Sequence, residues 1–157
     1  MATNKDAFSD YLQLEKKYSP HTVNAYLNDV NSFEAFNAIH FDQENVEQVN
    51  YGQIRNWIVF LVDSGISNSS VNRKIASLKA FYKFLLKIKQ IEINPLLKHK
   101  ALKVPKTLQI PFSEKEVEEA LSQMQNPQGF EAIRNKLIVD LFYTTGMRRT
   151  ELIHLKK

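Results

Sequence analysis

The sequence predicts an all-α protein. Apolar residues recur at the three- and four-residue spacing of amphipathic helices, and several of these segments open with a helix-capping serine, at Ser19, Ser67 and Ser113. We find no convincing alternation of apolar and polar residues of the kind that indicates a half-buried strand. Because 43% of the 157 residues are apolar and 11% are aromatic, the chain can build a packed core and does not belong to the disordered class.

Four helices are expected in the first hundred residues. The second has the strongest start, since Ser19 is a good N-cap and Pro20 suits the first helical position. The third closes at Gly65, and Ser67 then caps the fourth. The expected ranges are about 3–17, 19–37, 50–64 and 67–89, with a looser connection over 39–49. Their inner faces carry the predicted core residues Phe8, Tyr11, Leu12, Val23, Tyr26, Leu27, Val30, Phe33, Ile54, Trp57, Ile58, Leu61, Val71, Ile75, Leu78, Tyr82 and Leu85.

After these helices the pattern changes to a basic segment broken by prolines. Three prolines between residues 92 and 111 are hard to fit into a helix, so we expect a linker there that is mobile until a ligand orders it. Ser113 and Glu116 then form a capping box that opens a short helix. A turn near 126–129 precedes a helix whose inner residues are expected to be buried, namely Ile133, Leu137, Ile138, Leu141 and Phe142. The predicted organisation is a helical domain at 1–91, a linker at 92–111 and the start of a second domain at 112–157.

Positive charge is concentrated in one quarter of the chain. Between residues 67 and 106 nine lysines and Arg73 stand against the single acid Glu92, a net charge of +9. Because the whole chain carries +4, the remainder carries −5. This distribution is typical of a surface that binds a polyanion such as nucleic acid, and a solvated lysine-rich helix face is the alternative.

Composition also excludes several classes of site. The chain has no cysteine, its histidines have no metal-ligand spacing, and it has only four glycines, so we expect no disulfide, no metal, no nucleotide-binding glycine loop and no cofactor. No apolar run approaches the roughly 20 residues that span a bilayer. We therefore expect no membrane partner and a cytoplasmic location.

On the outer side of the fourth predicted helix, small residues alternate with basic ones. Ala76 and Ala80 lie between Arg73 and Lys83, which would let the backbone approach a groove while the cations reach phosphates. The outer side of the second helix is polar but nearly uncharged, as suits hydrogen bonding to base edges or phosphates, and a plain solvated face would look the same. The candidate DNA-binding residues are His21, Thr22, Asn24, Asn28, Ser69, Asn72, Arg73, Lys74, Ser77, Lys83, Lys103 and Lys106.

Several short motifs follow one another along essentially the whole chain. They are SPHTVNAY at 19–26, SSVNRKIASLKAFY at 69–82, Asn94-Pro95 with Val104-Pro105-Lys106, Phe112-Ser113 with Glu116-Val117, and LFYTTGMRRTEL at 141–152. In the last motif Gly146 stands where a left-handed cap would end one helix, so that Arg148 emerges at the start of the next. In order and spacing these motifs resemble the tyrosine recombinases, particularly the Xer-type enzymes and their integrase relatives.

The resemblance implies a fold and an activity. It implies a four-helix SAM-like core-binding domain that forms half of a clamp around duplex DNA, followed by the first helices of a truncated catalytic domain. Enzymes of this family cleave and rejoin DNA through a 3′-phosphotyrosine without a metal or other cofactor, and the Xer type acts in chromosome segregation at cell division. By position, Arg148 corresponds to the first catalytic arginine, which grips the scissile phosphate, and Glu151 to the acid that supports it. The implied partners are duplex DNA and other recombinase protomers, as a tetramer on paired sites.

The chain also departs from the family pattern. The lysine hairpin, the His-x-x-Arg box and the nucleophilic tyrosine of the family would all lie beyond residue 157. We therefore expect a fragment or a naturally truncated gene product that is inactive by itself. The alternatives are a non-catalytic helical DNA-binding or regulatory module derived from a recombinase, and a helical bundle that binds only proteins.

Overall fold

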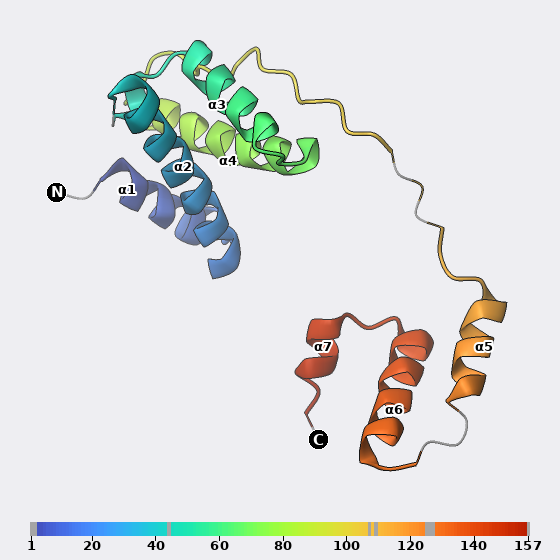
Figure 1. Cartoon of the computed structure of the whole chain (residues 1–157). Coiled ribbons are helices and arrows are strands. Elements are labelled where there is room, and N and C mark those ends of the chain that lie inside the picture. The colour runs from blue at the N-terminus through green and yellow to red at the C-terminus, as the bar shows by residue number, and fades with distance from the viewer. Residues whose placement is uncertain (1–2, 44, 107, 109, 125–127, 157) are drawn as a thin grey trace. The chain divides into compact units, whose positions relative to one another are not determined.

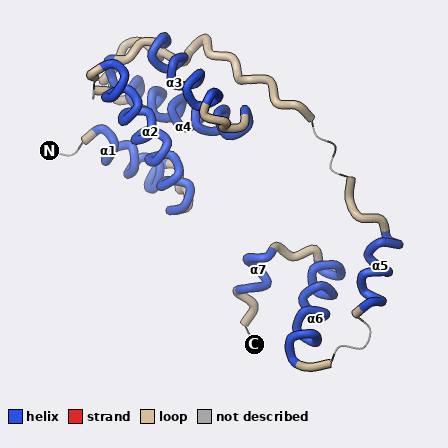
Figure 2. Tube along the Cα trace, viewed as in Figure 1, coloured by secondary structure: helices blue, strands red, loops and turns tan. Residues whose placement is uncertain are grey.

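The computed structural model describes residues 3–43, 45–106, 108, 110–124 and 128–156. Throughout this part of the chain the regular elements are helices, and no strand occurs (Figure 1, Figure 2). The predicted all-α fold is therefore confirmed. None of the described helices is long and apolar enough to cross a lipid bilayer. The chain divides into two compact units, Met1–Pro105 and Lys106–Lys157, which we describe separately.

The first unit contains the four predicted helices. Its α-helices are α1 (Asn4–Asp10), α2 (Pro20–Phe41), α3 (Tyr51–Asp63) and α4 (Asn68–Lys87). The first predicted helix is not continuous, because α1 runs into a π-helical turn, η1 (Tyr11–Glu15), and a 3-10 turn, η2 (Val46–Gln48), precedes α3. The predicted N-caps Ser19 and Ser67 accept hydrogen bonds from the backbone N–H groups of Thr22 and Ser70, so the starts of α2 and α4 are set locally.

Helix α2 continues beyond its predicted end because aromatic side chains in its last turn find partners. The rings of His40 and Phe41 lie 4.3 and 6.2 Å from the ring of Phe36. The ring of Phe60 on α3 lies 5.1 Å from the ring of Phe36 and 5.7 Å from that of His40. The helix ends at Asp42, whose φ of 50° is left-handed. Contacts between helices, which local patterns do not reveal, therefore lengthen α2.

The core lies between α2 and α4, which pair most extensively, and is completed by α1 and α3 (Figure 1). All predicted core residues are buried except Tyr11, Tyr26 and Leu27, which are partly buried against it. The hydroxyl of buried Tyr82 donates to the carbonyl of Val46 at 2.8 Å and so ties η2 to α4. Burial raises the pKa of Tyr82 well above its ordinary value, so its hydroxyl remains protonated.

One charged side chain is buried between α2 and α4. Asp29 of α2 is 2% exposed, and its carboxylate accepts a hydrogen bond from the Ser77 hydroxyl at 2.8 Å. Arg73 donates to it through both terminal nitrogens, at 2.8 and 3.2 Å, and the Lys74 ammonium donates at 3.0 Å. A buried carboxylate is tolerated only when it is paired and hydrogen-bonded. Because α4 supplies all four of these donated bonds, Asp29 fastens α4 to α2.

The chain after α4 folds back on the first unit. We call residues 94–105 the returning segment; Leu96 in it is buried and Leu102 is partly buried against the core. Asn72 of α4 donates to the Leu102 carbonyl and accepts from the Leu102 N–H, both at 2.9 Å. Asn68 donates to the carbonyl of Lys103, also at 2.9 Å. The first part of the predicted linker therefore lies on the first compact unit, which runs to Pro105.

The second unit contains α5 (Glu114–Gln123), α6 (Phe130–Thr145) and α7 (Arg149–Ile153). The predicted capping box starts α5: Glu116 accepts hydrogen bonds from the backbone and hydroxyl of Ser113, which hold the pKa of this carboxyl below its ordinary value. None of the described residues of this unit is buried. The predicted burial of α6 was wrong: Ile133 and Leu137 are exposed, and Ile138, Leu141 and Phe142 are only partly buried. The described part of the unit supplies no second layer to cover this helix.

Replacing Asn72 with alanine should loosen the returning segment. The substitution removes both hydrogen bonds to Leu102, each of which contributes about 1 kcal/mol net. Trypsin should then cut after Lys100 and Lys103 severalfold faster than in the unchanged chain, as measured by mass spectrometry of timed digests. Asn24→Ala, an exposed asparagine on α2, is the matched control and should leave the rates unchanged. Equal cleavage of the two variants would show that Asn72 does not hold the segment.

Replacing Ser77 with alanine should destabilise the first unit by about 1–2 kcal/mol, because the buried Asp29 carboxylate loses one of its donors. Ser69→Ala removes an exposed hydroxyl from the same helix and should change stability by no more than about 0.5 kcal/mol. Urea unfolding followed by the fluorescence of Trp57, the single tryptophan, reports on this unit because that side chain is buried. Equal stability of the two variants would contradict a structural role for Ser77.

Candidate nucleic-acid interface

The basic side chains between residues 67 and 106 divide into free and engaged ones. Lys83 on α4 and Lys103 in the returning segment are exposed, and Lys106 is exposed at the start of the second unit. Lys87 is engaged: it pairs with Glu15 of η1, and its ammonium lies 4.8 Å from the ring centroid of Tyr11. The hydrogen bond to Glu15 raises the pKa of Lys87. Lys87 therefore helps to hold η1 against α4.

Arg73 and Lys74 are neighbours in sequence, and both bind Asp29, yet they differ in exposure. The side chain of Arg73 is 56% exposed, whereas that of Lys74 is 19% exposed. A guanidinium has five N–H donors in a planar fork. Because the bonds to Asp29 use only one side of the fork, Arg73 can also bind an anion at the surface. The Lys74 ammonium is turned inward and serves as a counter-ion for Asp29.

Other residues predicted to contact DNA form hydrogen bonds within the protein instead. Asn72 is partly buried and bonded to Leu102, and Ser77 is buried with its hydroxyl on Asp29. The Thr22 hydroxyl lies 2.9 Å from the hydroxyl of the N-cap Ser19, so it belongs to the start of α2. None of these groups presents a free hydroxyl or amide on the surface in the way that the sequence pattern suggested.

The remaining predicted residues are exposed. His21, Asn24 and Asn28 lie on the outer side of α2. Ser69 lies in the first turn of α4, where its exposed hydroxyl is 3.1 Å from the hydroxyl of the N-cap Ser67. The structure thus brings α2 and α4 together through Asp29 and leaves an uncharged polar face on one helix and exposed cations on the other. Hydroxyl and amide groups beside cations suit a phosphate backbone, where both kinds of contact are common.

Asp29 was missed from the sequence, although a signal for it was present. It lies three residues after Tyr26 and four before Phe33, in the middle of the apolar stripe of α2. An acid on the inner face of a helix requires a buried cation or several donors. The structure shows these partners on α4. The pKa of neighbouring Tyr26 is raised, mainly by burial and further by the negative charges of Tyr18 and Asp29.

The second unit holds the predicted arginine turn. Gly146 ends α6 with a φ of 63°, and its N–H donates to the carbonyl of Phe142 at 3.0 Å, which confirms the predicted left-handed cap. Arg148 then precedes α7 in extended conformation. Its backbone N–H donates to Glu151 at 2.7 Å, and its guanidinium donates to the other carboxylate oxygen at 3.1 Å. Its side chain is nevertheless 85% exposed, so this arginine can also receive an anion.

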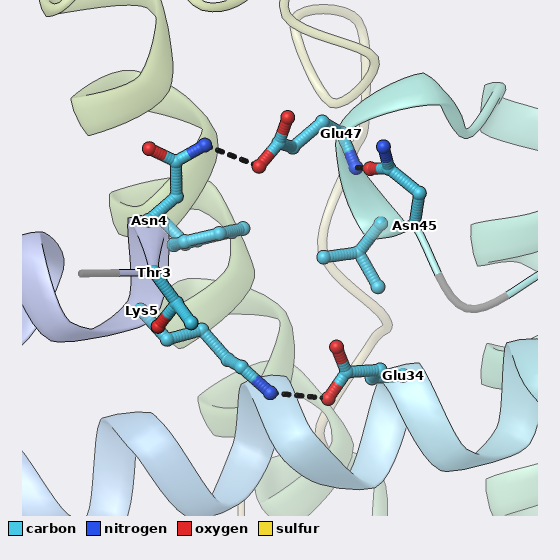
Figure 3. Close-up of a pocket in the computed structure, with 8 residues that line it drawn as sticks. Thr3, Asn4, Lys5, Glu34, Asn45 and Glu47 are labelled. Atoms are coloured by element: carbon cyan, nitrogen blue, oxygen red, sulfur yellow. Dashed lines mark hydrogen bonds and ion pairs between the residues drawn. The ribbon is translucent and has the colours of Figure 1, made fainter. Parts of the chain in front are cut away.

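A surface hollow of about 330 Å³ lies between the start of α1, α2 and η2 (Figure 3). Its polar side chains are directed at one another: Lys5 pairs with Glu34, and Asn4 donates to Glu47. These bonds attach the N-terminal helix to its neighbours. The hollow is therefore part of the scaffold and offers no set of free groups for a ligand. Nor do the described residues include a group of acidic or histidine side chains placed to hold a metal ion.

Comparison with known proteins identifies the first unit. Residues 6–89 match the family of the phage integrase N-terminal SAM-like domain. Tyrosine recombinase XerC of Bacillus licheniformis is 35% identical over 96% of this chain and 49% of its own length. The proteins of the same name from Staphylococcus aureus (strain USA300) and Pediococcus pentosaceus are 32% and 31% identical over 98% and 95% of this chain. No solved structure showed significant similarity.

The matched region covers more than half of the chain and contains most of α1 and all of α2 to α4, including the buried Asp29 and the exposed Arg73 and Lys83. The chain spans about half the length of the curated relatives that it matches. The resemblance seen in the sequence motifs is confirmed. The chain belongs to the phage integrase family, with the SAM-like N-terminal domain of the tyrosine recombinases.

Proposed function

We propose that this chain is the DNA-binding portion of a Xer-like site-specific tyrosine recombinase. The observation that carries the proposal is the net charge of +9 between residues 67 and 106. All of these cations except Lys106 fall in one compact unit, because the returning segment folds back on α4. Such a surface attracts duplex DNA and releases counterions when it binds.

Within this surface, Arg73, Lys83 and Lys103 contact phosphates, and Lys106 continues the basic series into the second unit. The exposed polar groups of α2 and α4 add hydrogen bonds to the backbone or base edges; they belong to His21, Asn24, Asn28 and Ser69. Phosphate contacts hold the protein on the duplex, and base-edge contacts supply what sequence preference it has. Lys74 and Ser77 act indirectly by holding Asp29.

The arginine turn belongs to the catalytic part of the same proposed enzyme. In the complete recombinase Arg148 grips the scissile phosphate, because a guanidinium remains charged and can bind two phosphate oxygens as negative charge builds. Glu151 orients it through the two hydrogen bonds seen here. The nucleophile of the family is a tyrosine, and residues 92–111 supply the linker between the two domains.

The proposed partners and setting follow from the same family. The recombinase assembles as a tetramer on paired DNA sites and acts in the cytoplasm on chromosomes, during their segregation at cell division. Neither the reaction nor the binding calls for a metal ion or other cofactor.

The chain should bind duplex DNA with a steep dependence on salt. The logarithm of the association constant should fall by about 0.9 per unit of log salt for each phosphate neutralised. Fluorescence anisotropy of a labelled duplex, titrated at several salt concentrations, measures this slope. Arg73→Ala combined with Lys83→Ala should lower the slope by about 2 and weaken binding to unrelated sequences alike.

Arg55→Ala is the control for that measurement. Arg55 is exposed on α3, so its loss changes the net charge without removing a cation from α4. It should leave the slope nearly unchanged. A slope near zero for the unchanged chain, or an equal effect of Arg55→Ala and Arg73→Ala, would contradict the proposed interface.

The 157-residue chain alone should bind DNA without cleaving it. In the family the nucleophilic tyrosine follows a His-x-x-Arg box, and this sequence contains no such box. Arg148 can stabilise charge on a phosphate, but without a nucleophile no covalent intermediate forms. Incubation with supercoiled plasmid should give neither relaxation nor a protein–DNA adduct on denaturing gels, beside a full-length tyrosine recombinase as the positive control. An adduct would show that one of the six tyrosines is a nucleophile.

A further inference from the structure

The Asp29 network contains two cations for one carboxylate. Arg73 and Lys74 both bind Asp29, and Ser77 adds a neutral donor. The site therefore keeps a net positive charge. Because the ammonium of Lys74 is turned inward and more than half of the Arg73 side chain is exposed, that excess charge reaches solvent through Arg73.

The geometry at Arg73 differs from that of an ordinary surface arginine. Two terminal nitrogens of its guanidinium bind the two carboxylate oxygens of Asp29, at 2.8 and 3.2 Å. A bidentate pair of this kind fixes the plane of the fork as well as its position. The other N–H groups of the fork are not used by this pair, and the described residues show no further hydrogen bond from the Arg73 guanidinium.

We propose that Asp29 is a positioning residue for DNA binding. It holds the Arg73 guanidinium in one orientation before DNA arrives, so that the free side of the fork meets a phosphate without first losing side-chain freedom. This inference rests on the proposed function, since it assigns a task to Asp29 at the same surface. A buried acid thereby strengthens the binding of a polyanion that its own charge would repel.

Two roles for Asp29 predict opposite effects of Asp29→Asn. The substitution keeps the size of the side chain and removes its negative charge. If Asp29 affected DNA only through its charge, the variant would bind duplex more tightly and with a steeper salt dependence. If Asp29 positions Arg73, the variant should bind about tenfold more weakly, and its salt slope should fall by about 0.9, the equivalent of one phosphate contact.

The salt slope also separates positioning from a general loss of structure. Partial unfolding lowers the fraction of active protein but leaves the slope of the folded fraction unchanged. Asp63→Asn is the matched control: Asp63 is exposed at the end of α3, so the same charge is removed away from Arg73. It should bind as the unchanged chain does, or slightly more tightly.

A double-mutant cycle tests whether Asp29 acts through Arg73. In the Arg73→Ala background Asp29→Asn should change the dissociation constant by less than about twofold, because the group that it positions is absent. If Asp29→Asn weakens binding equally in both backgrounds, Asp29 acts on the fold alone and the inference is overturned.

Arg73→Lys tests the same idea without altering the buried acid. Lysine keeps the charge but is a point charge rather than a fork, so it cannot bind Asp29 and a phosphate in one fixed plane. We expect binding about fivefold to tenfold weaker, with circular dichroism and Trp57 fluorescence unchanged. Binding equal to that of the unchanged chain would overturn the positioning role even if Asp29→Asn failed to fold.

The results also distinguish this inference from the proposed function. If the unchanged chain shows no salt-dependent binding, the proposed function fails and the inference fails with it. If the unchanged chain binds and Arg73→Ala weakens it, but Asp29→Asn binds as well or better, only the inference fails.

Discussion

The buried carboxylate of Asp29 is the interaction on which the first unit depends most. Packing of apolar side chains is not directional, so Leu78 and Val30 could meet in several neighbouring registers. The Asp29 carboxylate accepts bonds from Arg73, Lys74 and Ser77, which lie within about one turn of α4, and only one register of α2 on α4 provides them together. An unpaired charge there would be costly, so the network excludes the alternatives. The same network places Lys74 inside and leaves Arg73 more than half exposed.

Much of this fold could be predicted from local signals. Ser19, Ser67 and Ser113 cap helices where the sequence indicated, and Gly146 takes the left-handed conformation that ends α6. These features depend on residues within about one helical turn of each other, so a short stretch of sequence is enough to predict them. What could not be predicted depends on distant partners. Three features depend on contacts between residues far apart in the chain: the extension of α2, the bond of Asn72 to Leu102 and the pairing of Asp29. The type of a residue does not reveal which distant residue it contacts.

The candidate site shows the same division. Exposure of Lys83 and Ser69 followed from helical periodicity, whereas the inward turn of Lys74 and the burial of Ser77 did not. Periodicity places a residue at an angle on the helix, but it does not say whether a long cationic side chain finds an acid beside the helix. In the second unit the arginine turn formed as the local pattern indicated. The predicted burial of α6 was wrong, because a helix is buried only when other elements cover it, and its own sequence does not show whether they do.

The returning segment explains how a charge-rich stretch of sequence becomes a charged surface. If residues 94–105 were extended away from the helices, Lys98, Lys100 and Lys103 would be spread along a free chain. The span from Lys98 to Lys103 would then be roughly 17 Å, which exceeds the roughly 8–10 Å over which exposed charges act at physiological salt. Instead Leu96 enters the core, and Asn68 and Asn72 hold the backbone against α4. Uncharged side chains thus hold the returning segment in place, so its exposed lysines are not needed for folding. In the proposed interface the two asparagines of α4 contribute to DNA binding without touching the DNA, in the same indirect manner as we propose for Asp29.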